Sequence, residues 1–338
     1  MALVAGATRG AGRGIAIELA SAGAKVYCTG RSTTGHAATP GRPETIDETA
    51  ALISAAGGTA VALRVDHTVE DEVAALAARI GADEGRLDVL VNDIWGGDAL
   101  MDWGAKFWTL DMATVRGLVD QAVFSHLITS RHLAPLMVEA GRGLIVEVTD
   151  GELPGYRGQL LYDLVKASVI RLAYAMAWDL AGTGVTALAV SPGFLRSEAI
   201  LEGFGVTEAN WRDATGAHPD FAYSETPRYL GRAVAALAAD PDVGSKSGLA
   251  LFVGVLADEY GFTDVDGRRP HFWRHMEAWL DERLASGEAL EPQTRWIAAA
   301  RYGHIHLTPA YAARARGYAA WLGLEGLGAG LRPVDDPS

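Results

Sequence analysis

Cysteine and basic residues are scarce in this sequence, and both shortages restrict what the protein does. Cys28 is the one cysteine among 338 residues, so the chain cannot form an internal disulfide. It lies in an apolar run, residues 25–29, which indicates a buried strand residue rather than a nucleophile. The 29 lysines and arginines are outnumbered by 42 acidic residues, for a formal net charge of -13. That balance argues against a nucleic-acid backbone or an anionic membrane as the main partner, because both bind basic patches.

Long apolar stretches and metal-ligand sets are also missing. No uninterrupted apolar run reaches about 18 residues, and no basic leader precedes an apolar stretch of signal-peptide length. We therefore expect a soluble cytoplasmic protein without a membrane span, and a small molecule as its partner. His271 and His275 share helical spacing, and His304 and His306 share strand spacing, but no nearby acidic or cysteine ligand completes a recognised set. We expect no metal site.

What is present is an ordinary globular composition, with 49% hydrophobic and 21% charged residues. Over the first 250 or so residues, short β-rich apolar runs alternate with stretches of helical periodicity, which predicts a parallel sheet with helices on both faces. The predicted strands are residues 2–5, 25–29, 60–65, 89–92, 144–149, 186–190 and 249–253. Helices are predicted between most of them, for example over 12–22, 45–56 and 70–80. The fold class is therefore α/β, a Rossmann-like doubly wound parallel sheet of about seven strands.

The alternation stops at about residue 257. Helical patterns over 272–285 and 294–301 have no following strand, so we predict a catalytic domain over 1–257 and a mainly helical C-terminal extension over 258–338. Trp273, Trp279, Trp296 and Trp321 of the extension either pack on the catalytic domain, close a substrate cleft or bind a partner.

Two loops are rich in aromatic residues. Residues 93–110 carry Trp95, Trp103 and Trp108, and residues 192–226 carry Phe194, Phe204, Trp211, Phe221 and Tyr223. Both loops follow the carboxyl ends of predicted strands, where open α/β sheets bind ligands. The side chains therefore either line an apolar substrate pocket or pack in the core.

Tyr162 and Lys166 are four residues apart in a helical pattern, which places a phenol and an ammonium on one helix face. A fixed cation beside a phenol lowers its pKa from about 10 toward the working range of a general acid. On their own, such pairs are common on helix surfaces.

A glycine-rich turn follows the first predicted strand directly. Gly6, Gly10 and Gly12 lie where the chain passes from strand to helix, so the backbone can approach a pyrophosphate that the helix N-terminus holds. The second strand ends at Gly30 and Arg31, without the acidic residue that binds a ribose 2′-hydroxyl, and Arg9 lies in the glycine turn. Two guanidinium groups near the ribose favour NADP(H) over NAD(H), although NAD(H) remains possible.

These motifs occur in the order found in the short-chain dehydrogenase/reductase family, which this sequence resembles over residues 1–255. The glycine turn matches the family pattern TGxxxGxG with Ala5 in place of threonine. More narrowly, residues 85–92, 106–108, 143–146 and 260–267 resemble the subgroup called dehydrogenase/reductase member one. The cofactor-binding residues that the family resemblance implies are Gly6, Thr8, Arg9, Gly10, Ala11, Gly12, Arg31, Asp66, Asn92, Tyr162, Lys166, Pro192, Gly193, Leu195 and Ser197.

The resemblance implies catalysis by Tyr162 as general acid/base, with Lys166 lowering its pKa and binding the nicotinamide ribose. The family serine thirteen residues before the tyrosine is here Thr149, to which we assign the hydrogen bond to the reacting carbonyl, because an ionised Asp150 is a poor donor. The family asparagine behind the lysine falls near Ala122, and Gln121 and His126 are expected to pack or face solvent. The proton relay then uses a water or a backbone carbonyl.

The sequence thus predicts an NADP(H)-dependent oxidoreductase that reduces a ketone or aldehyde, or oxidises the matching secondary alcohol. The substrate is expected to be apolar. The resemblance also implies a homodimer or homotetramer. The altered residues after Asn92 leave an alternative open, namely a nucleotide-binding regulatory protein of the same fold or a member that catalyses elimination or isomerisation.

Overall fold

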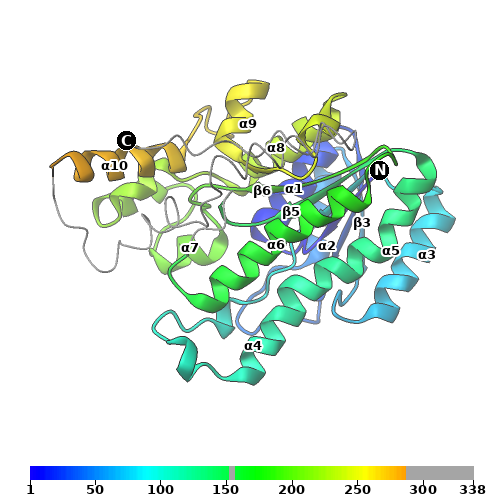
Figure 1. Cartoon of the computed structure of the whole chain (residues 1–338), viewed down its shortest axis with the longest axis horizontal. Helices are drawn as coiled ribbons and strands as arrows, with labels where there is room; N and C mark the ends of the chain where they lie inside the picture. The colour runs from blue at the N-terminus through cyan, green and yellow to red at the C-terminus, as the bar shows by residue number, and fades with distance from the viewer. Residues whose placement is uncertain (152–156, 287–338) are drawn as a thin grey trace, which may run out of the picture.

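A computed structural model describes residues 1–151 and 157–286 of the protein, which Figure 1 shows as a sheet flanked by helices. All the strand pairs are parallel, and the order is β3-β2-β1-β4-β5-β6-β7. The strands are β1 (Ala2–Ala5), β2 (Lys25–Gly30), β3 (Thr59–Arg64), β4 (Val89–Asn92), β5 (Gly143–Val148), β6 (Val185–Ser191) and β7 (Ala250–Phe252). The predicted doubly wound sheet is confirmed, and each strand lies within two residues of its predicted bounds.

The α-helices of the described residues connect these strands or follow the last of them. They are α1 (Gly10–Ser21), α2 (Ile46–Ala55), α3 (Glu70–Glu84), α4 (Met112–Val119), α5 (Ser125–Ala140), α6 (Leu160–Asp179), α7 (Glu198–Gly203), α8 (Pro227–Ala239), α9 (Val253–Tyr260) and α10 (Phe272–Ser286). A π-helical turn, Asp120–Phe124, joins α4 to α5. The predicted helix over 294–301 lies outside the described residues.

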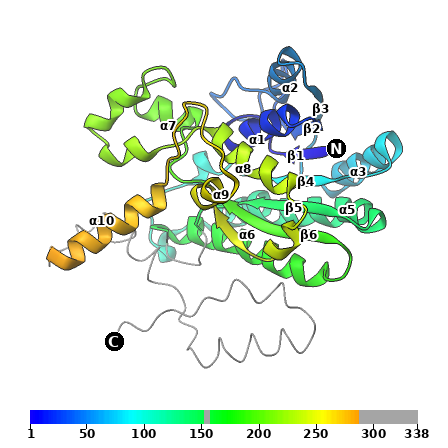
Figure 2. The same cartoon turned by 90° about the horizontal axis from the view of Figure 1, so that it is seen from above.

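Alternate side chains of the strands supply two separate cores. Val4, Val91 and Leu188 face one side, where α1, α2, α8 and α9 cover the sheet, whereas Leu3 and Leu90 face the other, where α3, α5 and α6 cover it. Figure 2 shows α1 and α8 next to each other, with α3 and α5 on the opposite side of the strands. Burial on both faces explains why the central strands read as continuous apolar runs.

The order of the strands fixes where a ligand can bind. The chain reverses direction across the sheet between β1 and β4, where Ala5 pairs with Asn92 at the carboxyl ends of the two strands. Open α/β sheets bind ligands in the crevice outside this point, because the loops above it diverge. The turn after Ala5 and the loop after Asn92 therefore border one crevice.

Residues beyond β7 contact the sheet domain closely. Asp264 is buried and its carboxylate accepts hydrogen bonds from the backbone N–H and the hydroxyl of Thr226, which precedes α8. Trp273 of α10 stacks on Phe252 of β7 at 5.3 Å between ring centroids. The division at residue 257 remains a prediction. Within the described part of the chain, no helix has the length and apolarity needed to cross a membrane.

Candidate active site

The glycine turn between β1 and α1 is tightly packed against its surroundings. Gly6 has φ 95°, and a Cβ at this position would lie 2.2 Å from the backbone oxygen of Asp93. A Cβ at Gly12 would lie 2.4 Å from the backbone oxygen of Gly6. Only glycine fits these two positions, because the backbone of the turn packs directly against the start of α1 and the loop after β4.

Two carboxylates lie at the N-terminus of α1. The N–H of Gly10 donates to Glu198 Oε2 at 2.9 Å, and the N–H of Gly12 donates to the half-buried carboxylate of Asp93. Burial raises the pKa of Asp93 to about 7, against the opposing influence of Lys166 and of the bond from Gly12. The positive end of the helix therefore attracts anions in this structure, as a pyrophosphate site requires.

Arg31 lies at the rim of an open cleft next to the crevice. Its guanidinium is 4.0 Å from the carboxylate of Asp66, so the structure brings these two predicted cofactor residues together. The cleft has a volume of about 530 Å³, and its lining residues are Arg31, Thr68, Gly117, Asp120, Gln121, Phe124 and Ile128. A basic group at the end of β2 is thus available to an anionic ligand.

Tyr162 and Lys166 share one face of α6, as the spacing predicted. Lys166 Nζ lies 5.6 Å from the centroid of the Tyr162 ring and 4.5 Å from that of Trp95. Both residues are half-buried. Gln159 caps the helix by accepting from the backbone N–H of Tyr162 at 2.8 Å, which fixes the first turn of α6, where Tyr162 lies. Burial lowers the pKa of Lys166, although Asp150 and Asp93 partly oppose this.

In the turn after β5, the side chains of two adjacent polar residues contact different groups. Thr149 is buried and its hydroxyl donates to the backbone oxygen of Lys166 at 2.9 Å. Asp150 instead faces the phenol, and Tyr162 Oη donates to Asp150 Oδ2 at 3.0 Å. The Thr149 hydroxyl, which the sequence assigned to the reacting carbonyl, is therefore bonded to the backbone of α6, and the neighbouring Asp150 is the residue that contacts the phenol.

The pKa of Tyr162 shifts in the direction opposite to our expectation. Burial, together with the charge of Asp150 and the hydrogen bond to it, raises this pKa well above its ordinary value. Lys166 Nζ lies over the ring, 5.6 Å from its centroid, and does not outweigh these effects. The net shift of this pKa is therefore upward, and a lowering contribution from Lys166 remains a prediction.

A buried polar network supports the loop after β4. Glu147 of β5 is fully buried and binds His126 Nδ1 at 2.6 Å and the side-chain nitrogen of Asn92 at 2.7 Å. His126 Nε2 lies 2.9 Å from the backbone oxygen of Ile94. Burial disfavours charge on His126, but the charge of Glu147 and these bonds raise its pKa overall. The network holds the backbone of the loop that borders the crevice.

Gln121 and His126 have defined roles that the sequence did not indicate. The side-chain nitrogen of Gln121 donates to the backbone oxygen of Trp95 at 3.1 Å, next to the Ile94 oxygen that His126 binds. Ala122, at the position of the family asparagine, is buried in the π-helical turn against Leu161 and Val165 of α6. A π-helical turn frequently marks a functional site.

The loop after β6 is stabilised by buried Glu225. The backbone N–H of Arg196 donates to the Glu225 oxygen at 2.8 Å, and the N–H of Gly193 donates to the Glu225 carboxylate. Burial raises the pKa of Glu225 to about 8. Ser197 caps α7 by accepting from the N–H of Ile200, so its hydroxyl is at the same end of α7 as Glu198, close to Gly10. Ser197 thus lies beside the glycine turn, and Pro192, Gly193 and Leu195 precede it in the same loop.

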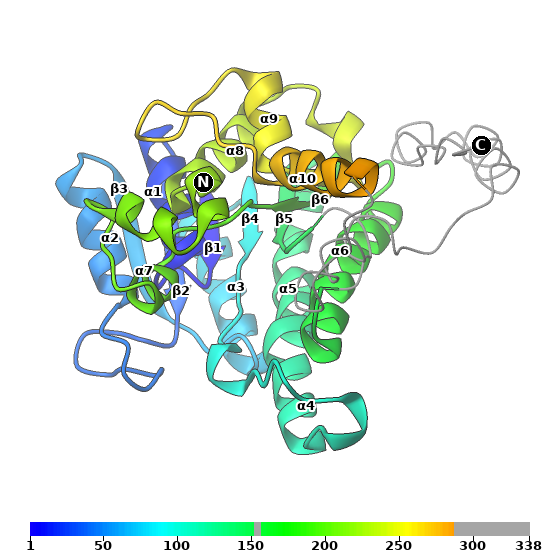
Figure 3. The same cartoon turned by 90° about the vertical axis from the view of Figure 1, so that its left-hand side faces the viewer.

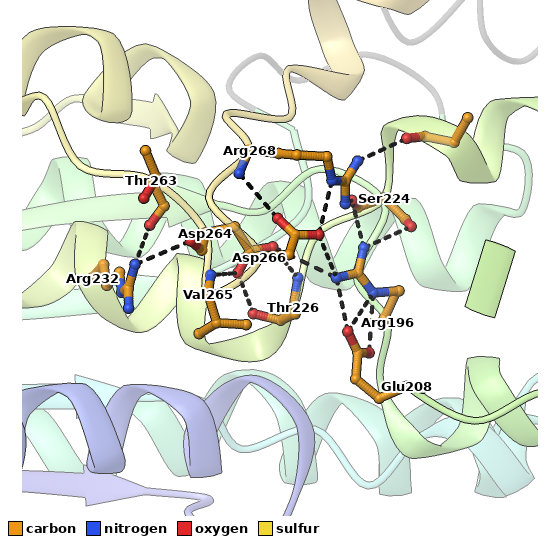
Figure 4. Close-up of polar contacts among 11 residues, drawn as sticks. Arg196, Glu208, Ser224, Thr226, Arg232, Thr263, Asp264, Val265, Asp266 and Arg268 are labelled. Carbon is orange, nitrogen blue, oxygen red and sulfur yellow. Dashed lines mark hydrogen bonds and ion pairs between the residues drawn. The ribbon is translucent and has the colours of Figure 1, made fainter. Parts of the chain in front are cut away.

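Arg196 ties this loop to the residues beyond β7, as Figure 4 shows. Its guanidinium is completely buried, donates to the Ser224 oxygen at 2.8 Å and pairs with Glu208 at 2.9 Å. Asp264 and Asp266 each lie 3.7 Å from the same nitrogen. Segments distant in sequence therefore meet around one buried cation.

The two aromatic loops differ in what they contact. Trp95 and Trp103 lie 5.6 and 5.1 Å from the Tyr162 ring, and 60% of the Trp103 surface is exposed. The loop that carries them leads into α4, which projects from the body of the molecule (Figures 1 and 3). Phe194, Trp211 and Phe221 instead form a small core of their own. Pocket lining thus fits the first loop, and core packing fits the second.

The site residues that the sequence analysis did not identify have one sequence feature in common. Glu147, Asp93 and Glu198 are carboxylates beside apolar strands or a glycine turn, where an acid requires a partner. No group of three or more potential metal ligands occurs within residues 1–151 and 157–286. His304 and His306 lie outside the described residues.

Comparison with known proteins agrees with this geometry. A family model for the short chain dehydrogenases matches residues 1–202. The chain is 35% identical to Dehydrogenase/reductase SDR family member 1 of Mus musculus, over 79% of this chain and 83% of that protein. A 7 alpha-hydroxysteroid dehydrogenase solved with NADH and 7-oxo glycochenodeoxycholic acid has a TM-score of 0.60 and 27% identity, over 74% of this chain and 91% of that one. A variant of actinorhodin polyketide ketoreductase solved with NADPH has a TM-score of 0.61 and 25% identity, over 75% of this chain and 94% of that one.

The fold and the glycine turn define a dinucleotide-binding protein of the Rossmann type. The chain belongs to the short-chain dehydrogenase/reductase family, and so to the oxidoreductases that use NAD(P)(H). The resemblance inferred from its motifs, including that to the member one subgroup, is confirmed.

Proposed function

We propose that this protein is an NADP(H)-dependent oxidoreductase that reduces a ketone or aldehyde, or oxidises the matching secondary alcohol, with Tyr162 as the general acid/base. The observation that carries the proposal is the position of the phenol. Tyr162 and Lys166 border the crevice whose other side is the glycine turn, and Asp93 lies between the two, near Lys166 and bonded to Gly12. This arrangement supports a proton donor beside a dinucleotide site.

The residues present fit a nicotinamide dinucleotide. Positions 6 and 12 form a cradle that any Cβ would fill, and the α1 N-terminus already attracts carboxylates. Gly10, Ala11 and Gly12 would hold the pyrophosphate, Asp66 the adenosine, and the segment from Pro192 to Ser197 the carboxamide. When bound, the dinucleotide supplies or accepts the hydride.

Tyr162 supplies the proton in the reductive direction. Its raised pKa keeps the phenol protonated at neutral pH, which is the form that donates to a carbonyl oxygen. Lys166 places a positive charge 5.6 Å from the centroid of the ring, where it stabilises negative charge that develops as the proton leaves. The assignment of Thr149 to the carbonyl remains a prediction that its bond to the Lys166 backbone does not favour.

The cofactor preference follows from the end of β2. Arg31 is partly exposed at the cleft, and its 4.0 Å ion pair with Asp66 leaves room for its guanidinium to pair with a 2′-phosphate as well. Trp95 and Trp103 beside the phenol fit an apolar carbonyl compound.

Turnover with apolar ketones tests the proposal directly. We expect loss of NADPH absorbance with cyclohexanone or a 7-oxo bile acid, and a Michaelis constant at least tenfold lower for NADPH than for NADH, since one charge-assisted pair contributes about 1.5–3 kcal/mol. NADPH binding without any turnover across such a panel would favour the regulatory or non-redox alternative. A lower constant for NADH would refute the preference for NADP(H) alone.

Glu198 provides a separate test of the pyrophosphate site. It occupies the N–H of Gly10, so a bound diphosphate must compete with its carboxylate. Replacing Glu198→Gln is expected to lower the dissociation constant of NADPH about fivefold or more, because two unit charges 4 Å apart repel by about 1 kcal/mol even in water. Fluorescence titration of bound NADPH measures the change.

Glu202→Gln is the matched control, since Glu202 lies on the same helix and pairs with Arg42 rather than with the glycine turn. We expect it to leave the dissociation constant within twofold. If both substitutions lowered the dissociation constant of NADPH equally, Glu198 would act only through the net charge of the protein.

A further inference from the structure

Asp150 is the carboxylate in direct contact with the proposed proton donor. Tyr162 Oη donates to its Oδ2 at 3.0 Å, and both residues are half-buried. An ionised carboxylate only accepts hydrogen bonds, so it cannot share with Tyr162 the task of donating to a substrate oxygen. Its position beside the phenol therefore calls for a different role.

We propose that Asp150 is a positioning residue that holds Tyr162 in its protonated, proton-donating form and so extends carbonyl reduction into the alkaline pH range. This inference rests on the proposed function, in which Tyr162 is the acid. Asp150 acts through the phenol and does not contact the substrate.

The turn that carries Asp150 is fixed on three sides. The N–H of Thr149 donates to the Val190 oxygen at 3.0 Å, and the N–H of Gly151 donates to Ser191 Oγ at 2.7 Å. Arg157, which is buried, donates to the backbone oxygen of Asp150 and lies 3.3 Å from the carboxylate of Asp163. These contacts direct the Thr149 side chain to α6 and the Asp150 side chain to Tyr162.

The charges around Tyr162 show which form of the phenol is favoured. Burial and Asp150 favour the neutral phenol, as does Asp98 from the loop after β4, whereas Arg157 favours the phenolate. Lys166 of α6 places its Nζ over the ring, 5.6 Å from the ring centroid. Loss of the phenolic proton would break the hydrogen bond and place two anions about 3 Å apart, which costs free energy.

The consequence appears in the pH dependence. In reduction, the carbonyl carbon takes the hydride, the carbonyl oxygen takes the Tyr162 proton, and the resulting phenolate regains a proton from solvent. Reduction therefore falls when pH rises past the pKa of the phenol, and a carboxylate that raises this pKa moves the fall to higher pH. Oxidation of an alcohol, which needs the phenolate as base, rises at correspondingly higher pH.

The test uses Asp150→Asn, which keeps the size of the side chain and removes its charge, with Asp150→Ser as a second variant. Near-ultraviolet absorbance of tyrosinate, measured without cofactor, reports ionisation. Subtracting the titration of Tyr162→Phe, in each background, isolates Tyr162. We expect Tyr162 to ionise at least one pH unit lower in Asp150→Asn, a tenfold change in the phenolate fraction. The alkaline limb of NADPH-dependent reduction should move by the same amount.

Asp179→Asn is the control, because Asp179 is exposed at the far end of the same helix. It should leave both titration and pH profile unchanged. Superimposable difference titrations of the protein and its Asp150→Asn variant would overturn the inference even if Tyr162→Phe abolishes turnover. Retained turnover in Tyr162→Phe would instead refute the proposed function, whatever the titrations show.

Discussion

Replacing Tyr162→Phe is expected to lower kcat/KM for carbonyl reduction by about 10²–10⁴-fold, the usual range for loss of a general acid. Phenylalanine keeps the ring that contacts Trp95 and Trp103 and removes only the proton donor. The dissociation constant of NADPH should change less than threefold, because the glycine turn and the residues around Arg31 are untouched. Steady-state kinetics and fluorescence titration measure the two quantities separately.

Tyr174→Phe is the matched control. Tyr174 lies on the same helix, is half-buried, and contacts Trp178 rather than the crevice. We expect turnover within twofold of the unsubstituted protein. Residual activity of Tyr162→Phe within tenfold of normal would show that another group supplies the proton.

Replacing Arg196→Met is expected to lower the free energy of unfolding by about 3–5 kcal/mol, since it removes one partner from a buried ion pair. Methionine fills much of the same volume, but Asp264 is itself fully buried and would lose its neighbouring positive charge. The bond to the Ser224 oxygen and the contact with the Trp211 ring, 4.3 Å from the guanidinium carbon, would also be lost. Urea denaturation followed by tryptophan fluorescence measures the loss.

Arg212→Met separates this effect from loss of a cation over the same ring. The Arg212 guanidinium carbon lies 4.5 Å from the Trp211 ring, but the residue is exposed. We expect its substitution to cost about 0.5 kcal/mol or less. A cost below about 1 kcal/mol for Arg196→Met would mean that water replaces the buried guanidinium readily.

The pattern of apolar residues was sufficient to predict the fold, because each strand and helix has a characteristic local spacing of apolar residues. The runs around Val4 and Val91 are buried on both faces, so they appear as uninterrupted apolar segments between helical periods. The pairing of Tyr162 with Lys166 is local too, because four residues is one helical turn. The cradle at Gly6 and Gly12 was visible for a similar reason, since close backbone approach permits no side chain.

The neighbour of the phenol was not predictable in this way. Thr149 and Asp150 are adjacent in sequence, and which of them reaches Tyr162 depends on a turn held by Ser191 and Arg157 from other parts of the chain. The pairing of Glu147 with His126 also joins residues 21 positions apart, from a strand and a helix. Sequence spacing does not record such contacts.

The sequence by itself determined the sheet, the glycine turn and the phenol with its ammonium four residues away, because each depends on local spacing and residue type. Only the tertiary structure decided the direction in which the pKa of Tyr162 moves. That direction is the sum of burial and of charges at specific distances, with Asp150 at the hydroxyl and Lys166 over the ring. Electrostatic energies depend on the distances between groups and on their burial, and both are set only when the chain has folded.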